Sequence, residues 1–191
     1  MPKFKLVVRE EPINARACGY GVKDRRAVDP APIIEVKLNY EAGEQEVPIF
    51  LVKNHPMLVL QASIWSVTGQ EKLPLKSLDD LLTGSLVVNA SLLKDDTGVA
   101  GCFFTFADIS IRSPGSYRLK FTLFDLGDTG VLSTGNQAAV TSVFSQVLSC
   151  FSPKDYPGKL DPPPLIRTFA QSLPMPIRKS KNTRESEDTT T

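Results

Sequence analysis

The chain has 191 residues, of which 41% are hydrophobic and 23% are charged, a composition typical of one folded domain and not of a fibrous or disordered protein. Its 22 Lys and Arg against 21 Asp and Glu leave a net charge of +1, so attraction to nucleic acid or anionic lipid must come from local clusters. The cysteines Cys18, Cys102 and Cys150 lack a C-x-x-C spacing, which disfavours a disulfide framework and a zinc site and predicts reduced, buried thiols.

Apolar runs in the chain are short. The run Leu6–Val8 near the N-terminus is too short for the apolar region of a secretory signal. Runs such as Met57–Leu60 fall far below the roughly 18 residues that a membrane helix needs. We therefore expect an intracellular, soluble protein with no membrane contact.

Most of the chain consists of β-type runs separated by Gly, Pro, Asn and Asp, which is typical of a mainly antiparallel, all-β sandwich or barrel. In chain order, the expected strands are Lys5–Arg9, Ile33–Tyr40, Val47–Val52, Leu58–Val67, Ser85–Leu93, Cys102–Ile111, Tyr117–Phe124 and Val143–Phe151. We expect them to form a single domain over residues 1–180, followed by a disordered polar tail over 181–191.

The strand Tyr117–Phe124 has the clearest alternation. Apolar side chains occupy every second position from Tyr117 to Leu123, while the positions between them are polar, so one face of this strand should be wet. The turn formers Ser113–Ser116 precede it and predict a hairpin with Cys102–Ile111.

Two short helices are expected. Ser77–Leu82 predicts one or two turns. The better candidate runs from Pro162 to Leu173: Asp161 can cap it, prolines suit its first turn, and apolar residues follow at helical spacing. A last strand is expected at Pro174–Ile177.

Alternation in the segment Cys102–Ile111 should turn some aromatic side chains away from the main core. By alternation these are either Phe103, or Phe104 together with Phe106. They are candidates for a dimer interface, but the helix Pro162–Leu173 could equally cover that face. The sequence leaves both alternatives open.

Residues for catalysis, a cofactor or a metal are missing from the sequence pattern. The single histidine, His55, lies in an expected loop with no triad around it. The segment Gly130–Gln137 has the glycine spacing of a phosphate loop, but Asn136 stands where the lysine is required. The acidic pairs of the chain lack calcium-loop spacing. We expect neither an enzyme nor a protein that binds a cofactor, a metal or a small-molecule substrate.

Positive charge is concentrated in two segments. The first contains Arg16, Lys23, Arg25 and Arg26 against Asp24 alone, and the second contains Arg178, Lys179 and Lys181. If the first and last strands lie on the same side of the sandwich, the two segments merge into one patch that can contact several phosphates. Solvated basic loops are the plainer alternative.

Three ordered stretches of the sequence resemble the velvet domain of fungal regulatory proteins. They are residues 6–33, with the basic run Lys23–Arg26; residues 101–121, with Gly101–Phe106 and Ser113–Tyr117; and residues 152–179, beginning Ser152–Gly158.

The resemblance implies an immunoglobulin-like β-sandwich similar to that of Rel-type transcription factors. It also implies double-stranded DNA binding through the N-terminal basic loop, homo- or heterodimers with other velvet proteins, location in the nucleus after import from the cytoplasm, and control of development, sporulation and secondary metabolism. By position in the motif, we expect Arg16, Lys23, Arg25 and Arg26 to contact DNA. A second hypothesis is an interaction subunit that leaves DNA contact to its partner.

Overall fold

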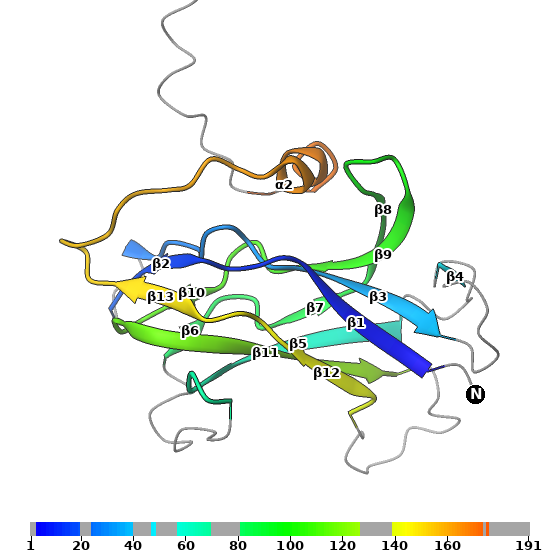
Figure 1. Cartoon of the computed structure of the whole chain (residues 1–191), viewed down its shortest axis with the longest axis horizontal. Coiled ribbons are helices and arrows are strands. Elements are labelled where there is room, and N and C mark those ends of the chain that lie inside the picture. The colour runs from blue at the N-terminus through cyan, green and yellow to red at the C-terminus, as the bar shows by residue number, and fades with distance from the viewer. Residues whose placement is uncertain are drawn as a thin grey trace, which may run out of the picture.

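Alternating apolar side chains build two β-sheets that face each other across a shared core (Figure 1). The computed structural model describes residues 3–19, 24–39, 47–48, 57–69, 81–126, 139–173 and 175. No helix among these residues is long and apolar enough to span a membrane.

The first sheet has the order β1-β3-β9-β8, and β4 also pairs with β3. Its strands are β1 (Lys3–Glu10), β3 (Ile33–Asn39), β4 (Val47–Pro48), β8 (Ser91–Lys94) and β9 (Ala100–Thr105). All of these pairs are antiparallel. Figure 1 shows this sheet lying between the second sheet and the helix α2 (Pro164–Phe169).

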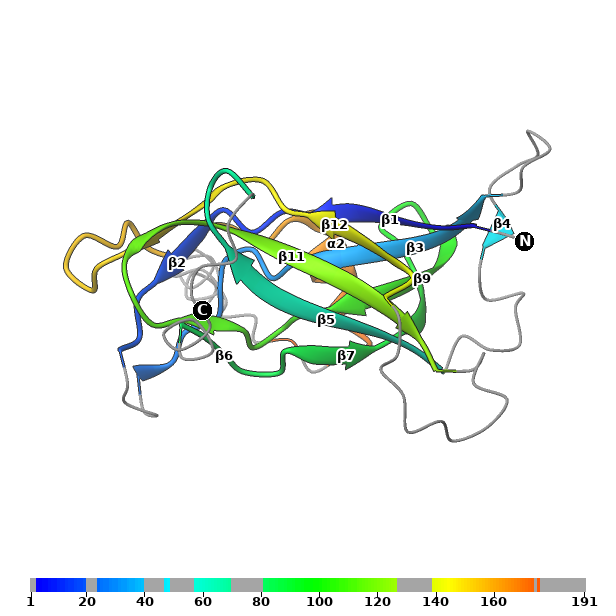
Figure 2. The same cartoon turned by 90° about the horizontal axis from the view of Figure 1, so that it is seen from below.

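The second sheet has the order β2-β13-β11-β5-β7, with β12 also paired to β11. Its strands are β2 (Asn14–Arg16), β5 (Leu58–Trp65), β7 (Val87–Asn89), β11 (Gly115–Asp125), β12 (Thr141–Phe144) and β13 (Leu148–Phe151). Figure 2 shows β11 and β5 side by side across this face. A small separate pair joins β6 (Leu82–Thr83) to β10 (Ser110–Ile111).

The main core lies between the sheets, and a second core lies under α2. The inward side chains of β11, such as Leu119 and Phe121, are fully buried, as the alternation of that strand predicts. On β9 the alternation divides the aromatics, so that Phe104 enters the main core and Phe103 faces α2. Phe103 packs edge-on against Phe169, with ring centroids 4.9 Å apart.

The burial of these aromatics decides between the two alternatives for the face of β9. Phe103, Phe104 and Phe106 are all almost completely buried. Phe106 belongs to the main core, and α2 covers Phe103. The helix therefore covers Phe103, and of the two alternatives the one in which these aromatics form an exposed dimer contact is wrong.

The all-β fold is confirmed, but the hairpin predicted at Ser113–Ser116 is wrong. The predicted strand Cys102–Ile111 is two strands, because the chain leaves the first sheet after Thr105 and reaches β10 at Ser110. β9 pairs with β3 and β8, whereas β11 pairs with β5, β12 and β13. The segment between β9 and β11 therefore crosses from one sheet to the other.

Other strand and helix boundaries differ from those expected from the sequence. The expected strand Ser85–Leu93 divides at Ala90 into β7 and β8, and Val143–Phe151 divides into β12 and β13. The helix begins at Pro164 with Pro163 as its N-cap and no side-chain cap, so the predicted capping role of Asp161 is wrong. The short strands β2 and β6 were not expected.

Several expectations concern residues outside those described. They are most of the helix at Ser77–Leu82, most of the strand at Pro174–Ile177 and the tail at 181–191. Within the described part, Leu82 belongs to β6. Cys18, Cys102 and Cys150 are free and buried, which confirms the prediction of reduced, buried thiols.

Candidate nucleic-acid interface

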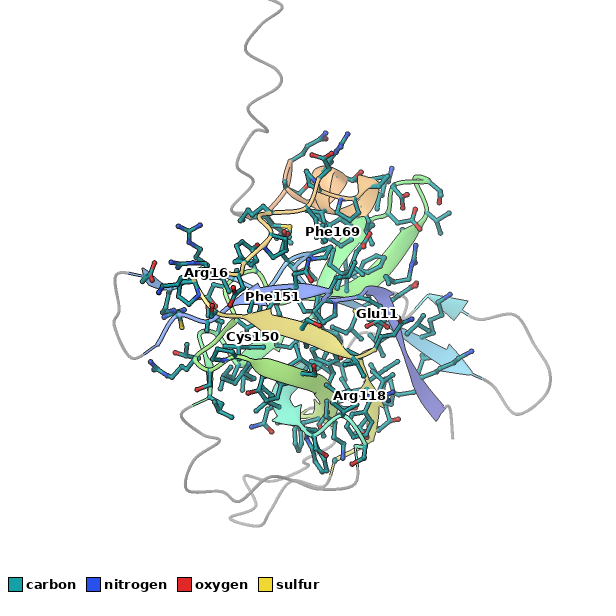
Figure 3. All side chains as sticks on the ribbon, turned by 60° about the vertical axis from the view of Figure 1, so that its left-hand side comes forward. Glu11, Arg16, Arg118, Cys150, Phe151 and Phe169 are labelled. Carbon is teal, nitrogen blue, oxygen red and sulfur yellow. The ribbon has the colours of Figure 1, made fainter. Side chains whose placement is uncertain are left out.

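The N-terminal basic segment begins on a strand that is held from both sides. β2 pairs in parallel with β13, with Arg16 opposite Phe151, and the Ala17 N–H donates to the Phe151 carbonyl oxygen at 2.8 Å. On the other side, the Cys18 N–H donates to the Ile111 carbonyl oxygen at 3.0 Å. Figure 3 shows Arg16 beside Phe151 at the end of β13. The loop therefore leaves the sandwich from a fixed base.

Arg112 also holds the start of the basic loop, through hydrogen bonds with Gly19. Its Nη1 donates to the Gly19 carbonyl oxygen at 3.0 Å, while the Gly19 N–H donates to the Arg112 carbonyl oxygen at 3.1 Å. Gly19 has a φ of 57°, the left-handed region that glycine adopts without steric cost. The chain can therefore turn outward at Gly19 without strain.

Arg16 joins the two described ends of the loop. Its Nη1 donates to Asp24 Oδ1 at 2.8 Å, and the Arg16 side chain is only 16% exposed while that of Asp24 is 53% exposed. The hydrogen bond from Arg16 lowers the pKa of Asp24 below its ordinary value. Arg16 thus connects Asp24, on the far side of the loop, to β2.

Arg25 is held by a different acid. Its Nη2 lies 3.1 Å from Asp108 Oδ2 and 3.2 Å from the Asp108 carbonyl oxygen. The other carboxylate oxygen of Asp108 accepts a hydrogen bond from the Ser85 N–H at 2.7 Å. A Cβ on Gly84 would lie 2.4 Å from the Asp108 carbonyl oxygen, so glycine is required where the backbone approaches Asp108. Arg25 is therefore anchored to the segment that crosses between the sheets.

Arg26 is exposed and makes no hydrogen bond or ion pair with another described residue. Burial raises the pKa of Tyr156 and the charge of Asp29 adds to this, while the charges of Arg26 and Arg16 act in the opposite direction. Tyr156 therefore lies within electrostatic reach of both arginines. It brings the segment after β13, with the exposed Lys154, to the same end of the sandwich.

The structure brings together three of the predicted site residues, Arg16, Arg25 and Arg26. The other three, Lys23, Arg178 and Lys179, lie outside the described residues, so the merging of the two basic segments stays a prediction. The sequence did not lead us to expect Lys154 and Arg112 at this end of the sandwich. The signal for Lys154 was present, because Ser152–Gly158 belongs to one of the stretches that carry the family resemblance.

Two observations concern metal or cofactor binding by the described residues. No group of three His, Cys, Asp or Glu side chains among them could hold a metal ion. A cavity of about 50 Å³ lies between Ala27–Ala31 and the segment Lys159–Ile166. The Asp29 carboxylate at its wall accepts a hydrogen bond from the Leu160 N–H at 2.6 Å. This hydrogen bond joins the segment before β3 to the segment before α2, so this part of the cavity wall is a contact that belongs to the fold.

Comparison with known proteins identifies relatives of the whole domain. The family model described as "Velvet factor" matches residues 4–79 and 71–182. The chain is 34% identical over 173 residues to the sexual development regulator VELC of Pyricularia oryzae, covering 88% of this chain and 39% of that protein. It is 34% identical over 158 residues to the spore development regulator vosA of Beauveria bassiana, covering 80% of this chain and 57% of that protein.

A third relative carries a name that refers to an assembly. The chain is 39% identical over 101 residues to the velvet complex subunit umv2 of Mycosarcoma maydis, covering 52% of this chain and 21% of that protein. The chain therefore spans about half the length, or less, of each of these relatives.

Proposed function

The chain belongs to the velvet family, and from this premise we propose that it is a nuclear regulator of fungal development that binds double-stranded DNA as a homo- or heterodimer with velvet proteins. The names of its relatives support the developmental role, and the name of the velvet complex subunit supports velvet partners. Control of secondary metabolism, implied by the family resemblance, stays a prediction.

The observation that carries the DNA proposal is the gathering of Arg16, Arg25 and Arg26 at one end of the sandwich. Guanidinium groups can donate two parallel hydrogen bonds to a phosphate or to a guanine edge. The base of the loop is fixed by the pairing of β2 with β13, so little entropy would be lost in placing these groups. Lys154 adds a further exposed cation beside them.

A salt titration tests the assignment of Arg25 and Arg26. Wild type and the double variant Arg25→Ala, Arg26→Ala are titrated with a fluorescent DNA duplex between about 50 and 200 mM salt. If both arginines neutralise phosphates, the slope of log affinity against log salt falls by about two in the double variant. An unchanged slope and affinity would show that the two arginines do not contact DNA.

The control is a second double variant that removes the same charge elsewhere. Lys94 at the end of β8 and Arg167 on α2 are both exposed, and neither lies on the basic loop. Changing both to alanine should leave the slope close to that of wild type. An equal loss in both double variants would point to the net charge of the protein and not to a site.

One observation favours a second candidate function, a dimerisation subunit that relies on its partner for DNA contact. Arg16 and Arg25 are both engaged by aspartates, so the surface offers fewer uncompensated cations than the sequence suggests. In that case, DNA binding of the purified chain would be weak. It would tighten only when a second velvet protein is added, and the Arg25→Ala, Arg26→Ala variant would behave like wild type in the complex.

A further inference from the structure

Two Ser-Pro dipeptides lie beside the candidate DNA loop. Ser113-Pro114 and Ser152-Pro153 are the only places in the chain where proline follows serine or threonine. Gly115 lies opposite Cys150 in the antiparallel pair of β11 and β13, so both dipeptides leave the sheet at the same end. Proline after the acceptor hydroxyl is the feature that proline-directed protein kinases recognise.

The Ser152 dipeptide sits in a small exposed turn. The Ser152 Oγ donates to Asp155 Oδ2 at 2.5 Å, and the Asp155 N–H donates to the Ser152 carbonyl oxygen at 3.2 Å. The side chains of Pro153, Lys154 and Asp155 are all exposed. A kinase must draw the acceptor into an extended conformation, and the hydrogen bonds of the Ser152 turn itself are local to residues 152–155.

The turn at Ser113 is closed more firmly. The Tyr117 hydroxyl lies 3.4 Å from the Ser113 carbonyl oxygen and 3.2 Å from the Pro114 carbonyl oxygen. Gly115 has a φ of 153°, and a Cβ there would lie 2.7 Å from the Tyr117 hydroxyl oxygen. The tyrosine ring therefore holds this turn against the sheet, whereas the hydrogen bonds of the Ser152 hydroxyl stay within its own turn, which favours Ser152 as the acceptor.

Two arginines of the candidate interface, Arg16 and Arg26, lie near the residues that flank the Ser152 turn. Phe151, immediately before it, lies opposite Arg16 in the parallel pair of β2 and β13. Tyr156, immediately after the turn, is within electrostatic reach of Arg16 and Arg26. A group attached at Ser152 is therefore close to two of the arginines proposed to bind DNA phosphates.

We propose that Ser152 is a phosphorylation site of a proline-directed protein kinase, and that its phosphate occupies Arg16 and Arg26 and so weakens DNA binding. This proposal rests on the proposed DNA-binding function. In the modification, the Ser152 Oγ forms a bond to the γ-phosphorus of ATP and the bond from that phosphorus to the β,γ-bridging oxygen breaks. ADP leaves, and the hydroxyl proton passes to the catalytic carboxylate of the kinase.

The phosphate changes the turn through charge. It carries about −1.5 to −2 charges at pH 7 and offers three strong acceptor oxygens. Ser152 then has no proton to donate to Asp155, and the two negative groups repel each other. Guanidinium groups are preferred partners for phosphate, so the modified side chain is expected to turn toward the arginines.

The first part of the test locates the modification. The full chain is incubated with a proline-directed kinase and ATP, and the phosphate is located by mass spectrometry in wild type and in the Ser152→Ala and Ser113→Ala variants. We expect one phosphate on Ser152 that persists in Ser113→Ala and disappears in Ser152→Ala. A phosphate found only at Ser113, or at neither serine, overturns the proposal.

The second part measures the consequence for DNA. Occupying two arginines removes two phosphate contacts, so the salt slope should fall by about two and the affinity at 0.15 M salt by about 30-fold. Kinase-treated Ser152→Ala should bind as untreated wild type does. A phosphorylated protein with unchanged affinity would overturn the proposed switch. The phosphate mimic Ser152→Glu should also weaken DNA binding, whereas its charge control Ser142→Glu, on the exposed side of β12, should not.

A readout without DNA separates this proposal from the proposed function. The side-chain Nε–H resonances of Arg16 and Arg26, observed by NMR, should shift on phosphorylation of Ser152 and not in treated Ser152→Ala. If the unmodified chain fails to bind DNA while these resonances shift, the proposed function fails and the phosphate site stands. Unmoved resonances in the phosphorylated protein overturn the arginine contact.

Discussion

In the proposed DNA complex, Asp24 competes with DNA for Arg16, and replacing it with asparagine should strengthen DNA binding. The amide oxygen of asparagine can still accept the hydrogen bond that Arg16 Nη1 donates at 2.8 Å, so the loop keeps its shape while its negative charge is removed. The Asp24 side chain is 53% exposed, so a phosphate that approaches Arg16 from solvent would meet the charge of its carboxylate. The substitution therefore changes charge at the site with little change in packing.

The size of the effect follows from counterion release. Each phosphate neutralised on duplex DNA contributes about −0.9 to the slope of log affinity against log salt. If Asp24→Asn makes Arg16 available for one more contact, the slope should steepen by about 0.9. The affinity at 0.15 M salt should then rise about fivefold. Fluorescence anisotropy with a labelled duplex between about 50 and 200 mM salt measures both quantities.

Asp96→Asn is the matched control. Asp96 is exposed in the turn between β8 and β9 and carries the same charge as Asp24, but Figure 1 shows that turn away from β2. Its substitution should raise affinity only through net charge, without the steeper slope. Equal effects of the two substitutions would refute the competition between Asp24 and DNA for Arg16.

Three further predictions concern stability and reactivity. Phe169→Ala removes the ring that packs on Phe103 under α2, so the free energy of unfolding in urea should fall by about 3–5 kcal/mol, while DNA affinity per folded molecule should stay unchanged. Burial alone would raise the pKa of Asp95, but hydrogen bonds from Thr97, Arg9 and Val99 outweigh it and lower that pKa to about 2. A carboxylate with a lowered pKa stabilises the fold above its ordinary pKa of 3.8, and this stabilisation is lost as the pH falls toward 2. The melting temperature of Asp95→Asn should therefore lie below that of wild type at pH 7, and the gap should narrow between pH 4 and pH 2; a constant gap would contradict the role of its charge. Burial raises the pKa of Cys102 and Cys150 to about 12, so iodoacetamide at pH 8 should label these thiols in urea and hardly at all in the native protein, as mass spectrometry can establish.

Local patterns in the sequence predicted the parts of the fold that depend on local physics. The strand β11 alternates strictly because one of its faces lies on the core and the other is partly exposed, so periodicity located it correctly. Its partners depend on which strands meet across the sheets, which periodicity does not encode. The segment Cys102–Ile111 reads as one apolar run because both of its halves are buried, although they belong to different sheets.

For the candidate site, the sequence predicted which basic residues to consider but not their ionic partners. Clustering of basic residues in the sequence was enough to choose Arg16, Arg25 and Arg26. Their ionic partners were not predictable, because Asp108 approaches Arg25 only after the chain has crossed from β9 to β10. The same holds for the Ser152 turn, which reaches Arg16 through a parallel pairing between strands at opposite ends of the described chain.

The parallel pairing of β2 with β13 also has a consequence for synthesis on the ribosome. The basic loop is translated long before Phe151, yet its start depends on hydrogen bonds to that residue, which lies on the last described strand, β13. A nascent chain that ends before Phe151 therefore carries the basic residues without the β2–β13 pairing that holds the start of their loop. Because the closing contact is so distant in sequence, the interface should be among the last features to form, and a truncated product should be unable to compete with the finished protein for its target.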